Sequence, residues 1–178
     1  MNKFKKMKSK IFIDFDFTNF WDDCEYSFEK YVEECPNEDL IISIEQELGY
    51  KLPVSYVELM KLHNGGITKK SSYSVNEEDY IEITGIMGIG RTKTYSLCGE
   101  IGSQFMIDEW DYPKIGVCIC HCPSGGHDMV MLDYSNCGED GEPEVVHIDQ
   151  ESDYEKTFLA KDFETFVRGL VDEEGFEN

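Results

Sequence analysis

Apolar residues recur with a helical period in four segments of the chain. In each segment the apolar side chains form a stripe opposite polar and acidic residues, which is the pattern of a helix packed against a core. Asn37 and Asp162 each precede such a stripe and can cap the helix, and Gly49 can end the second one. The pattern predicts helices over residues 21–32, 38–48, 53–63 and 163–171.

Alternating apolar and polar residues, together with runs of β-forming residues, predict strands elsewhere. The expected strands cover residues 11–17, 80–86, 95–98, 115–122, 129–133 and 145–148. The sequence Pro123-Ser124-Gly125-Gly126 is strong turn chemistry, so residues 115–134 are expected to form a hairpin. Residues 67–79 are polar and loop-like, and residues 103–114 fit either a helix or an extended chain.

The order of these elements predicts the fold class. Several strands follow one another without intervening helices, which favours an α+β fold with a central, mostly antiparallel sheet and packed helices. A chain of 178 residues with 40% hydrophobic residues can bury a core of its own. We expect residues 11–178 to form a single domain, preceded by a flexible basic arm at residues 1–10.

The charge of the chain limits the partners that it can bind. Sixteen bases and 37 acids give a net charge of −21, and five of the bases lie in the first ten residues. The rest of the chain therefore carries 11 − 37 = −26. Self-repulsion on this scale disfavours nucleic acid and anionic lipid and favours a basic partner. Residues 22–45 and 133–178 are especially acidic, and each is interpreted either as an ordinary solvated surface or as a surface that faces a partner.

Cysteine use and hydropathy indicate a compartment. The seven cysteines are an odd number, and the N-terminus has no apolar core or cleavage site of a signal peptide. They are interpreted as reduced thiols of a cytoplasmic protein. No apolar run approaches the roughly 20 residues that span a bilayer, so no membrane partner is expected.

Two clusters resemble metal sites but have unsuitable spacing. Cys118, Cys120 and Cys122 alternate along a predicted strand, near His121 and His127. Neighbouring thiols on one face would lie about 6.6–6.8 Å apart, too far for one zinc ion, so buried thiols are the preferred interpretation. The segment 133–144 imitates a calcium loop, but its fifth position is a cysteine and its flanks are strands. No metal or other cofactor is predicted.

Two further motifs suggest catalysis or phosphate binding only weakly. Gly85, Gly88 and Gly90 follow a strand, but no amphipathic helix comes after them to hold a phosphate, so a tight turn is preferred. Cys122, His127 and Asp128 supply a nucleophile, a base and an orienting acid within one turn. A reactive thiol needs electropositive surroundings, so hydrogen bonds that close the hairpin are the preferred role. No catalytic residue is predicted.

The chain resembles a known superfamily in two places. The segment Leu48-Gly49-Tyr50-Lys51-Leu52-Pro53, followed by Leu62-His63-Asn64-Gly65-Gly66, resembles the helix–turn signature of the SUKH superfamily (Smi–Knr family). The second half is similar as well, in its segments Trp110-Asp111-Tyr112-Pro113, Pro123-Ser124-Gly125-Gly126-His127-Asp128, Leu132-Asp133-Tyr134 and Gly141–Asp149. The resemblance covers roughly residues 36–172.

This resemblance implies an α+β fold and a protein without enzymatic activity. Bacterial members are cytoplasmic immunity proteins that bind polymorphic toxins, many of them nucleases or deaminases, and fungal members regulate cell-wall synthesis. Nucleases carry basic substrate grooves, which an acidic protein can occlude. We therefore expect an immunity-type protein that neutralises a basic cognate toxin. The alternative is a regulatory or scaffold module without a toxin partner.

Five residues are the candidate partner-binding set. Trp110 and Tyr112 are aromatic residues among acids and suit an interface anchor, although both also suit a core. The remaining three residues belong to segments that match the family, and a structural role is equally open for the first two of them: His127, Asp128 and Asp133. The sequence does not indicate an oligomeric state.

Overall fold

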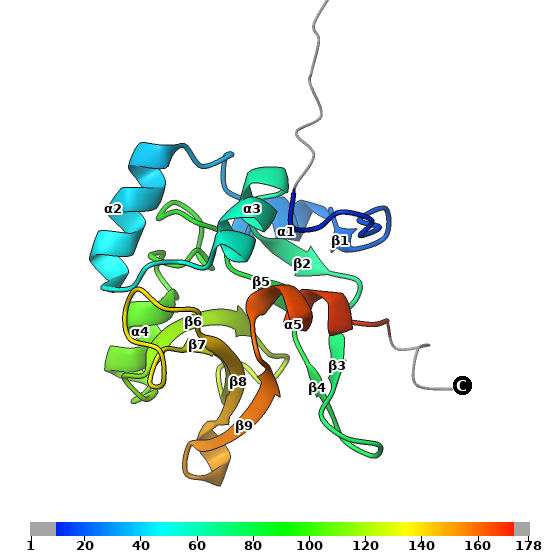
Figure 1. Cartoon of the computed structure of the whole chain (residues 1–178), viewed down its shortest axis with the longest axis vertical. Helices are drawn as coiled ribbons and strands as arrows, with labels where there is room; N and C mark the ends of the chain where they lie inside the picture. The colour runs from blue at the N-terminus through cyan, green and yellow to red at the C-terminus, as the bar shows by residue number, and fades with distance from the viewer. Residues whose placement is uncertain (1–9, 173–178) are drawn as a thin grey trace, which may run out of the picture.

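A seven-stranded antiparallel sheet organises the fold (Figure 1). The computed structural model describes residues 10–172, so the predicted basic arm lies outside the described residues except for Lys10. The strand order is β1-β2-β5-β6-β7-β8-β9. The strands are β1 (Trp21–Asp22), β2 (Gly66–Thr68), β5 (Gly85–Ile86), β6 (Gly116–His121), β7 (Asp128–Asp133), β8 (Glu144–Asp149) and β9 (Glu155–Ala160).

Helices surround this sheet, and a small second sheet projects beside it (Figure 1). The helices are α1 (Glu25–Lys30), α2 (Glu38–Leu48), α3 (Val54–Leu62), α4 (Ser103–Glu109) and α5 (Phe163–Gly169), and a 3-10 turn, η1, covers Gln150–Ser152. The second sheet pairs β3 (Ser72–Ser74) with β4 (Tyr80–Glu82). This arrangement confirms the predicted α+β fold with a mostly antiparallel sheet. Within the described residues, no helix is both long and apolar enough to cross a membrane.

The middle of the large sheet is the core of the protein. Every residue of β6 is buried, β7 is buried except at its first residue, and β8 is buried except at its two ends. Helix α4 contacts β6, while α5 contacts β8 and β9 and packs against α3. The rings of Tyr56 and Phe163 join α3 to α5 with centroids 4.6 Å apart. Burial on both faces explains why residues 115–122 form a nearly continuous apolar run rather than an alternating one.

The predicted caps of the helices are confirmed. The side chain of Asn37 accepts a hydrogen bond from the backbone N–H of Leu40 at 2.8 Å. Asp162 does the same for Thr165 at 2.7 Å, and Gly49 ends α2 with a φ of 79°. These short polar side chains satisfy backbone N–H groups that a helix leaves free at its start.

The Asn64-Gly65-Gly66 turn after α3 connects three segments that are distant in sequence. Asn64 is only 3% exposed, and its side-chain amide donates to the carbonyls of Glu34 (2.6 Å) and Ile89 (3.0 Å). Its side-chain oxygen accepts from the N–H of Ile89 at 2.7 Å. Gly65 has a φ of 83°, and a Cβ there would lie 2.5 Å from the nitrogen of Gly88. The turn therefore requires a glycine and an amide side chain for close backbone contact.

Three predictions of secondary structure are wrong. Residues 11–17 bend rather than form a strand, because Phe12, Phe15 and Phe17 fold back on one another as a ring cluster. The expected helix over 21–32 begins as strand β1 and is helical only over α1. Residues 95–98 make one isolated bridge, from Gly88 to Ser96, instead of a strand.

Other segments differ from the expectation in extent. The stretch 67–79, expected to be a loop, includes most of β2 and all of β3. The ambiguous stretch 103–114 begins with helix α4, which ends before Trp110. Strand β9, which was not predicted, completes the sheet by pairing with β8.

Replacing Asn64 with alanine tests the turn. Asn64→Ala leaves the two buried backbone groups of Ile89 and the partly buried carbonyl of Glu34 without a partner, so we expect a loss of roughly 3 kcal/mol in the free energy of unfolding, measured by urea denaturation. Asn76→Ala is the matched control, because Asn76 makes the same kinds of bonds in an exposed turn, and it should lose less than about 1 kcal/mol. Equal losses would contradict the role assigned to Asn64.

Candidate functional site

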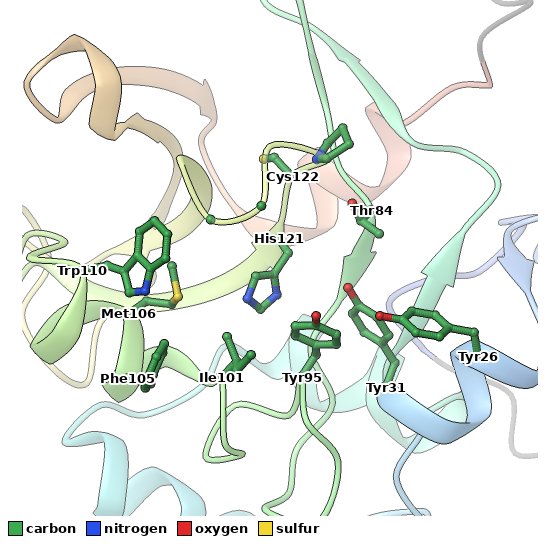
Figure 2. A pocket seen from close by; sticks show the side chains of 13 residues that line it. Tyr26, Tyr31, Thr84, Tyr95, Ile101, Phe105, Met106, Trp110, His121 and Cys122 are labelled. Atoms are coloured by element: carbon green, nitrogen blue, oxygen red, sulfur yellow. The ribbon is translucent and has the colours of Figure 1, made fainter.

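A cleft of about 460 Å³ opens beside the end of β6 (Figure 2). Its volume is in the range of sites that bind small groups. Residues from α1, the loop before α4, α4 itself and the β6–β7 turn surround it. The lining residues are Tyr26, Tyr31, Thr84, Tyr95, Ile101, Phe105, Met106, Trp110, His121, Cys122, Pro123, Gly125 and Gly126.

His121 lies at the centre of this cleft. Figure 2 shows its ring between Trp110 and Met106 on one side and Tyr95 and Tyr31 on the other. His121 is 7% exposed, and neither ring nitrogen has a hydrogen-bond partner among the described residues. Burial lowers the pKa of His121 to about 4, so the imidazole is neutral at pH 7. It therefore holds one unused N–H donor and one unused acceptor.

Tyrosine rings form one wall of the cleft. The rings of Tyr31 and Tyr95 stack with centroids 4.7 Å apart, and the Tyr95 ring meets that of His121 edge-on at 4.6 Å. Tyr26 is hydrogen-bonded to Tyr95, which ties α1 to the loop. Burial raises the pKa of Tyr31 and of Tyr95, so both hydroxyl groups remain protonated at pH 7.

Glu33 fixes the loop that carries Tyr95. Its carboxylate accepts hydrogen bonds from the N–H groups of Thr92 (2.7 Å) and Lys93 (3.0 Å). It also accepts from the hydroxyls of Thr92 and Ser96, both at 2.6 Å. Burial alone would raise the pKa of Glu33, but the hydrogen bonds from Ser96, Thr92 and Lys93 lower it below its ordinary value. This carboxylate is therefore ionised at neutral pH and holds four donors together.

Trp110 and the Pro123–Gly126 turn form the opposite wall. The Trp110 ring meets the exposed His127 ring edge-on at 5.5 Å, and Tyr154 donates to the Trp110 carbonyl at 2.7 Å. Gly126 has a φ of 104°, and a Cβ there would lie 3.4 Å from the Trp110 ring. Trp110 and His127, both predicted as partner-binding residues, thus lie together at the edge of the cleft.

Tyr112 has a different place from the one expected for an anchor. It is 2% exposed, and its hydroxyl donates to the carbonyl of Gly126 at 2.7 Å. In this position Tyr112 supports the β6–β7 turn from below and offers no surface to a partner. The turn after α4 directs Tyr112 inward and leaves Trp110 beside the cleft. Tyr112 is therefore not placed as an exposed anchor.

The chain matches a protein-family model over most of its length. The model of the SMI1 / KNR4 family (SUKH-1) matches residues 35–169. The chain belongs to the SMI1 / KNR4 family (SUKH-1). The resemblance identified from the sequence is therefore confirmed. A comparison with curated proteins finds no match. Tyr26 and Tyr31 precede the matched region, so this SUKH-1 protein completes its cleft with residues outside the family match.

A second cluster shares Cys122 with the cleft of this SUKH-1 protein. One potential ligand atom from each of Cys122, Asp128 and His147 lies within 4.8 Å of the others. His147 Nε2 is 2.7 Å from Asp128 Oδ2, and the Cys122 thiol is hydrogen-bonded to the same carboxylate. These donors are of the types that bind zinc. The expectation that the protein uses no metal stays a prediction.

The cluster corrects the grouping of Cys122, Asp128 and His127. The partner of Asp128 is His147, whereas His127 is 2.9 Å from Gln150. Pairing of β7 with β8 places His147 opposite Val130, on the same face as Asp128 two residues away. The alternation of residues within one strand does not reveal that His147 lies beside Asp128. The register of the β7–β8 pairing would reveal it. Burial, followed by the nearby Asp128 charge, raises the pKa of Cys122 well above its ordinary value, so the thiol is protonated.

The other predicted residues and motifs have structural roles in the SUKH-1 fold. Asp133 is 2% exposed and accepts from Lys156 (2.8 Å) and Ser135 (2.6 Å). Burial raises the pKa of this carboxyl group, but the hydrogen bonds from Lys156 and Ser135 lower it by more, and the pKa lies below its ordinary value. The carboxylate is therefore charged and already paired. Asp133 therefore has no free surface for a partner. Cys118 and Cys120 are buried in β6, and burial raises the pKa of both thiols, which suits core side chains.

The glycines at 85, 88 and 90 allow close packing. A Cβ at Gly85 would lie 2.6 Å from the Gly66 carbonyl oxygen, and one at Gly88 would lie 2.5 Å from that of Asn64. A Cβ at Gly90 would lie 2.5 Å from the Glu33 carboxyl carbon. These contacts explain the glycines as positions where the Asn64 turn and Glu33 approach the backbone.

Replacing Glu33 with glutamine tests how the Tyr95 loop is held. Glu33→Gln places an amide donor among four donors, so we expect a loss of roughly 1–2 kcal/mol in the free energy of unfolding at pH 7. Because folding lowers the pKa of Glu33, its stabilising effect is present above the ordinary value of 4.5 and is lost as pH falls through the folded-state pKa. The difference from the native protein should therefore shrink in urea titrations below about pH 4.

The matched control is Glu29→Gln. Glu29 pairs with Lys30 on the exposed side of α1, and its replacement should leave the midpoint of urea denaturation unchanged. A pH-independent difference for Glu33→Gln would contradict the account of a charged carboxylate.

Proposed function

We propose that this SUKH-1 protein is a non-enzymatic, cytoplasmic immunity-type protein that binds a basic toxin and neutralises it by occlusion. Family membership fits both an immunity-type and a regulatory protein. The observation that favours the toxin partner is the charge of −21. A nuclease or deaminase that acts on nucleic acid presents a basic groove to phosphates, and an acidic protein associates rapidly with such a groove.

The proposed docking face is the mouth of the aromatic cleft. Four exposed acids are immediate sequence neighbours of its lining residues: Glu25, Glu100, Glu109 and Asp111. Trp110 and His127 supply ring surface among these charges, and Asp128 lies at the adjoining turn. An apolar centre surrounded by charge is the usual anatomy of a protein interface. Tyr112 and Asp133 are not part of this proposed face because they are buried.

The absence of enzymatic activity is supported by the chemistry of the Cys122 cluster. A thiol nucleophile needs a base to take its proton and a positive neighbour to stabilise the thiolate. Here the carboxylate of Asp128 stands between the thiol and His147, and its charge disfavours the thiolate. The arrangement is that of a hydrogen-bonded support for the turn.

The proposal is tested by recovery of the partner from the native cell. Immobilised protein should retain a basic protein that elutes at raised salt and is identified by mass spectrometry. Excess SUKH-1 protein should then abolish the activity of that purified partner. A partner whose activity is unchanged at saturation would contradict the immunity role, and a recovered signalling or cell-wall enzyme would support the regulatory alternative instead.

Charge reversal at the mouth of the cleft tests the docking face. Glu100→Lys with Glu109→Lys should raise the dissociation constant of the recovered partner by roughly tenfold or more at low salt, measured by calorimetry. Glu77→Lys with Glu78→Lys makes the same change of charge on the turn between β3 and β4, which projects from the body of the fold (Figure 1). That control should change affinity less than about threefold, and equal effects would contradict the assigned face.

A further inference from the structure

His121 combines a buried position with two unused hydrogen-bonding atoms. We propose that the cleft receives an aromatic side chain of a basic protein partner, a tyrosine or tryptophan, which donates its O–H or N–H hydrogen bond to His121. The inference rests on the proposed function only in taking the partner to be a basic protein. The inference adds the type of partner residue that anchors the complex, and it assigns recognition of that residue to a ring nitrogen of His121.

The imidazole of His121 is unsatisfied. Neither ring nitrogen has a hydrogen-bond partner in the part of the chain that the structure describes, although buried polar groups in native proteins are nearly always hydrogen-bonded. Leaving such a group unpaired destabilises the free protein, so its retention indicates a use in the bound state. A partner side chain that donates a hydrogen bond to the His121 ring would remove this cost, and a purely apolar side chain would not.

The walls of the cleft have the composition of a site for an aromatic ring. Five aromatic side chains line the cleft: Tyr26, Tyr31, Tyr95, Phe105 and Trp110. Aromatic rings pack favourably in offset and edge-on geometries, as the rings of Tyr95 and His121 already do. A volume of about 460 Å³ accommodates one large aromatic side chain.

The distribution of charge around the cleft favours an aromatic side chain over a cationic one. The thirteen residues lining the cleft include no carboxylate, so a lysine or arginine side chain would enter without an ion-pair partner. The carboxylates stand outside, beside the lining residues in sequence, at Glu25, Glu100, Glu109 and Asp111. This distribution suits an aromatic residue flanked by basic residues. It disfavours a ligand that carries phosphates.

Binding requires a small rearrangement of the cleft. The nitrogens of His121 are buried in the free protein, and Tyr95 lies against the ring. Tyr95 is carried by a loop rather than by the sheet, and changes of side-chain rotamer are common when proteins associate. Rotation of Tyr95 is the movement that admits the guest to His121.

The experiment uses capped five-residue peptides and the full-length protein. The peptide Lys-Lys-Tyr-Lys-Lys is compared with peptides that carry Phe, Leu or Arg at the centre. Affinities come from calorimetry, and the His121 ring nitrogens are followed by NMR. We expect the Tyr peptide to bind about tenfold more tightly than the Phe peptide, with a shift of the His121 signals. In His121→Phe the preference for Tyr over Phe should disappear.

Two controls keep the result specific. Phe158 is 56% exposed on β9 and does not line the cleft, so Phe158→Ala should leave every affinity unchanged. If His121→Phe fails to fold, the difference in affinity between the Tyr and Phe peptides for the native protein still tests the inference.

Three outcomes would overturn the inference. Equal affinity for the Tyr, Phe and Leu peptides, with unmoved His121 signals, would show that charge alone binds them and would leave the proposed function standing. Tightest binding of the Arg peptide would assign the cleft to a cation. Binding of N-acetyl-tyrosinamide as tight as that of the Tyr peptide would assign it to a free small molecule.

Discussion

The side chain of Asn64 is the contact on which the rest of the structure depends. It joins the end of α3 to the carbonyl of Glu34 and to both backbone groups of Ile89. These bonds set the chain after α1 and the chain after β5 side by side. Glu33, next to the first of them, then collects the N–H and hydroxyl groups of the 92–96 loop. The position of Tyr95 beside His121 is therefore a consequence of two polar side chains that lie outside the cleft.

The cleft is assembled from parts that have little in common in sequence. Tyr26 and Tyr31 come from α1 and its end, Tyr95 from a loop, Trp110 from the end of α4, and His121 from the last position of β6. The loop that carries Tyr95 is held by the Glu33 carboxylate, so the Tyr95 ring approaches the others without belonging to a helix or strand. The strand that supplies His121 is wholly buried, and it ends where the cleft begins. A core strand thus delivers an unpaired imidazole to an aromatic surface, which is the local inconsistency expected of a functional site.

Much of the fold could be predicted because its signals are local. The caps at Asn37 and Asp162, the glycine after α2, and the Pro123–Gly126 turn act through neighbouring atoms, and the structure contains all of them. The alternation over 11–17 misled because phenylalanines in a bent segment can satisfy one another as well as a sheet can. Residues 95–98 misled because a loop held by hydrogen bonds can also bury its side chains, and here the adjacent residues Ser96 and Leu97 are both buried.

The candidate site was less predictable because its contacts are between distant segments. Trp110 and His127 were identified as surface residues, and they meet at the edge of the cleft. Tyr112 and Asp133 looked equivalent to them in sequence, but the bend after α4 and the salt bridge to Lys156 remove both from the surface. His121 drew attention only as a neighbour of cysteines. Its importance follows from what surrounds it, and that depends on loops whose paths no periodicity predicts.

Charge and shape have separate roles in this account. In the proposed function, the net charge of −21 favours a basic partner and accelerates association, and we infer that the cleft selects the residue that anchors this partner. The most direct measurement of this claim is backbone hydrogen exchange of the protein with and without its recovered partner. The account predicts slower exchange in the 91–102 loop and the 123–127 turn, with the 75–79 turn unchanged. Protection confined to the 75–79 turn, with the segments around the cleft exchanging as in the free protein, would contradict it.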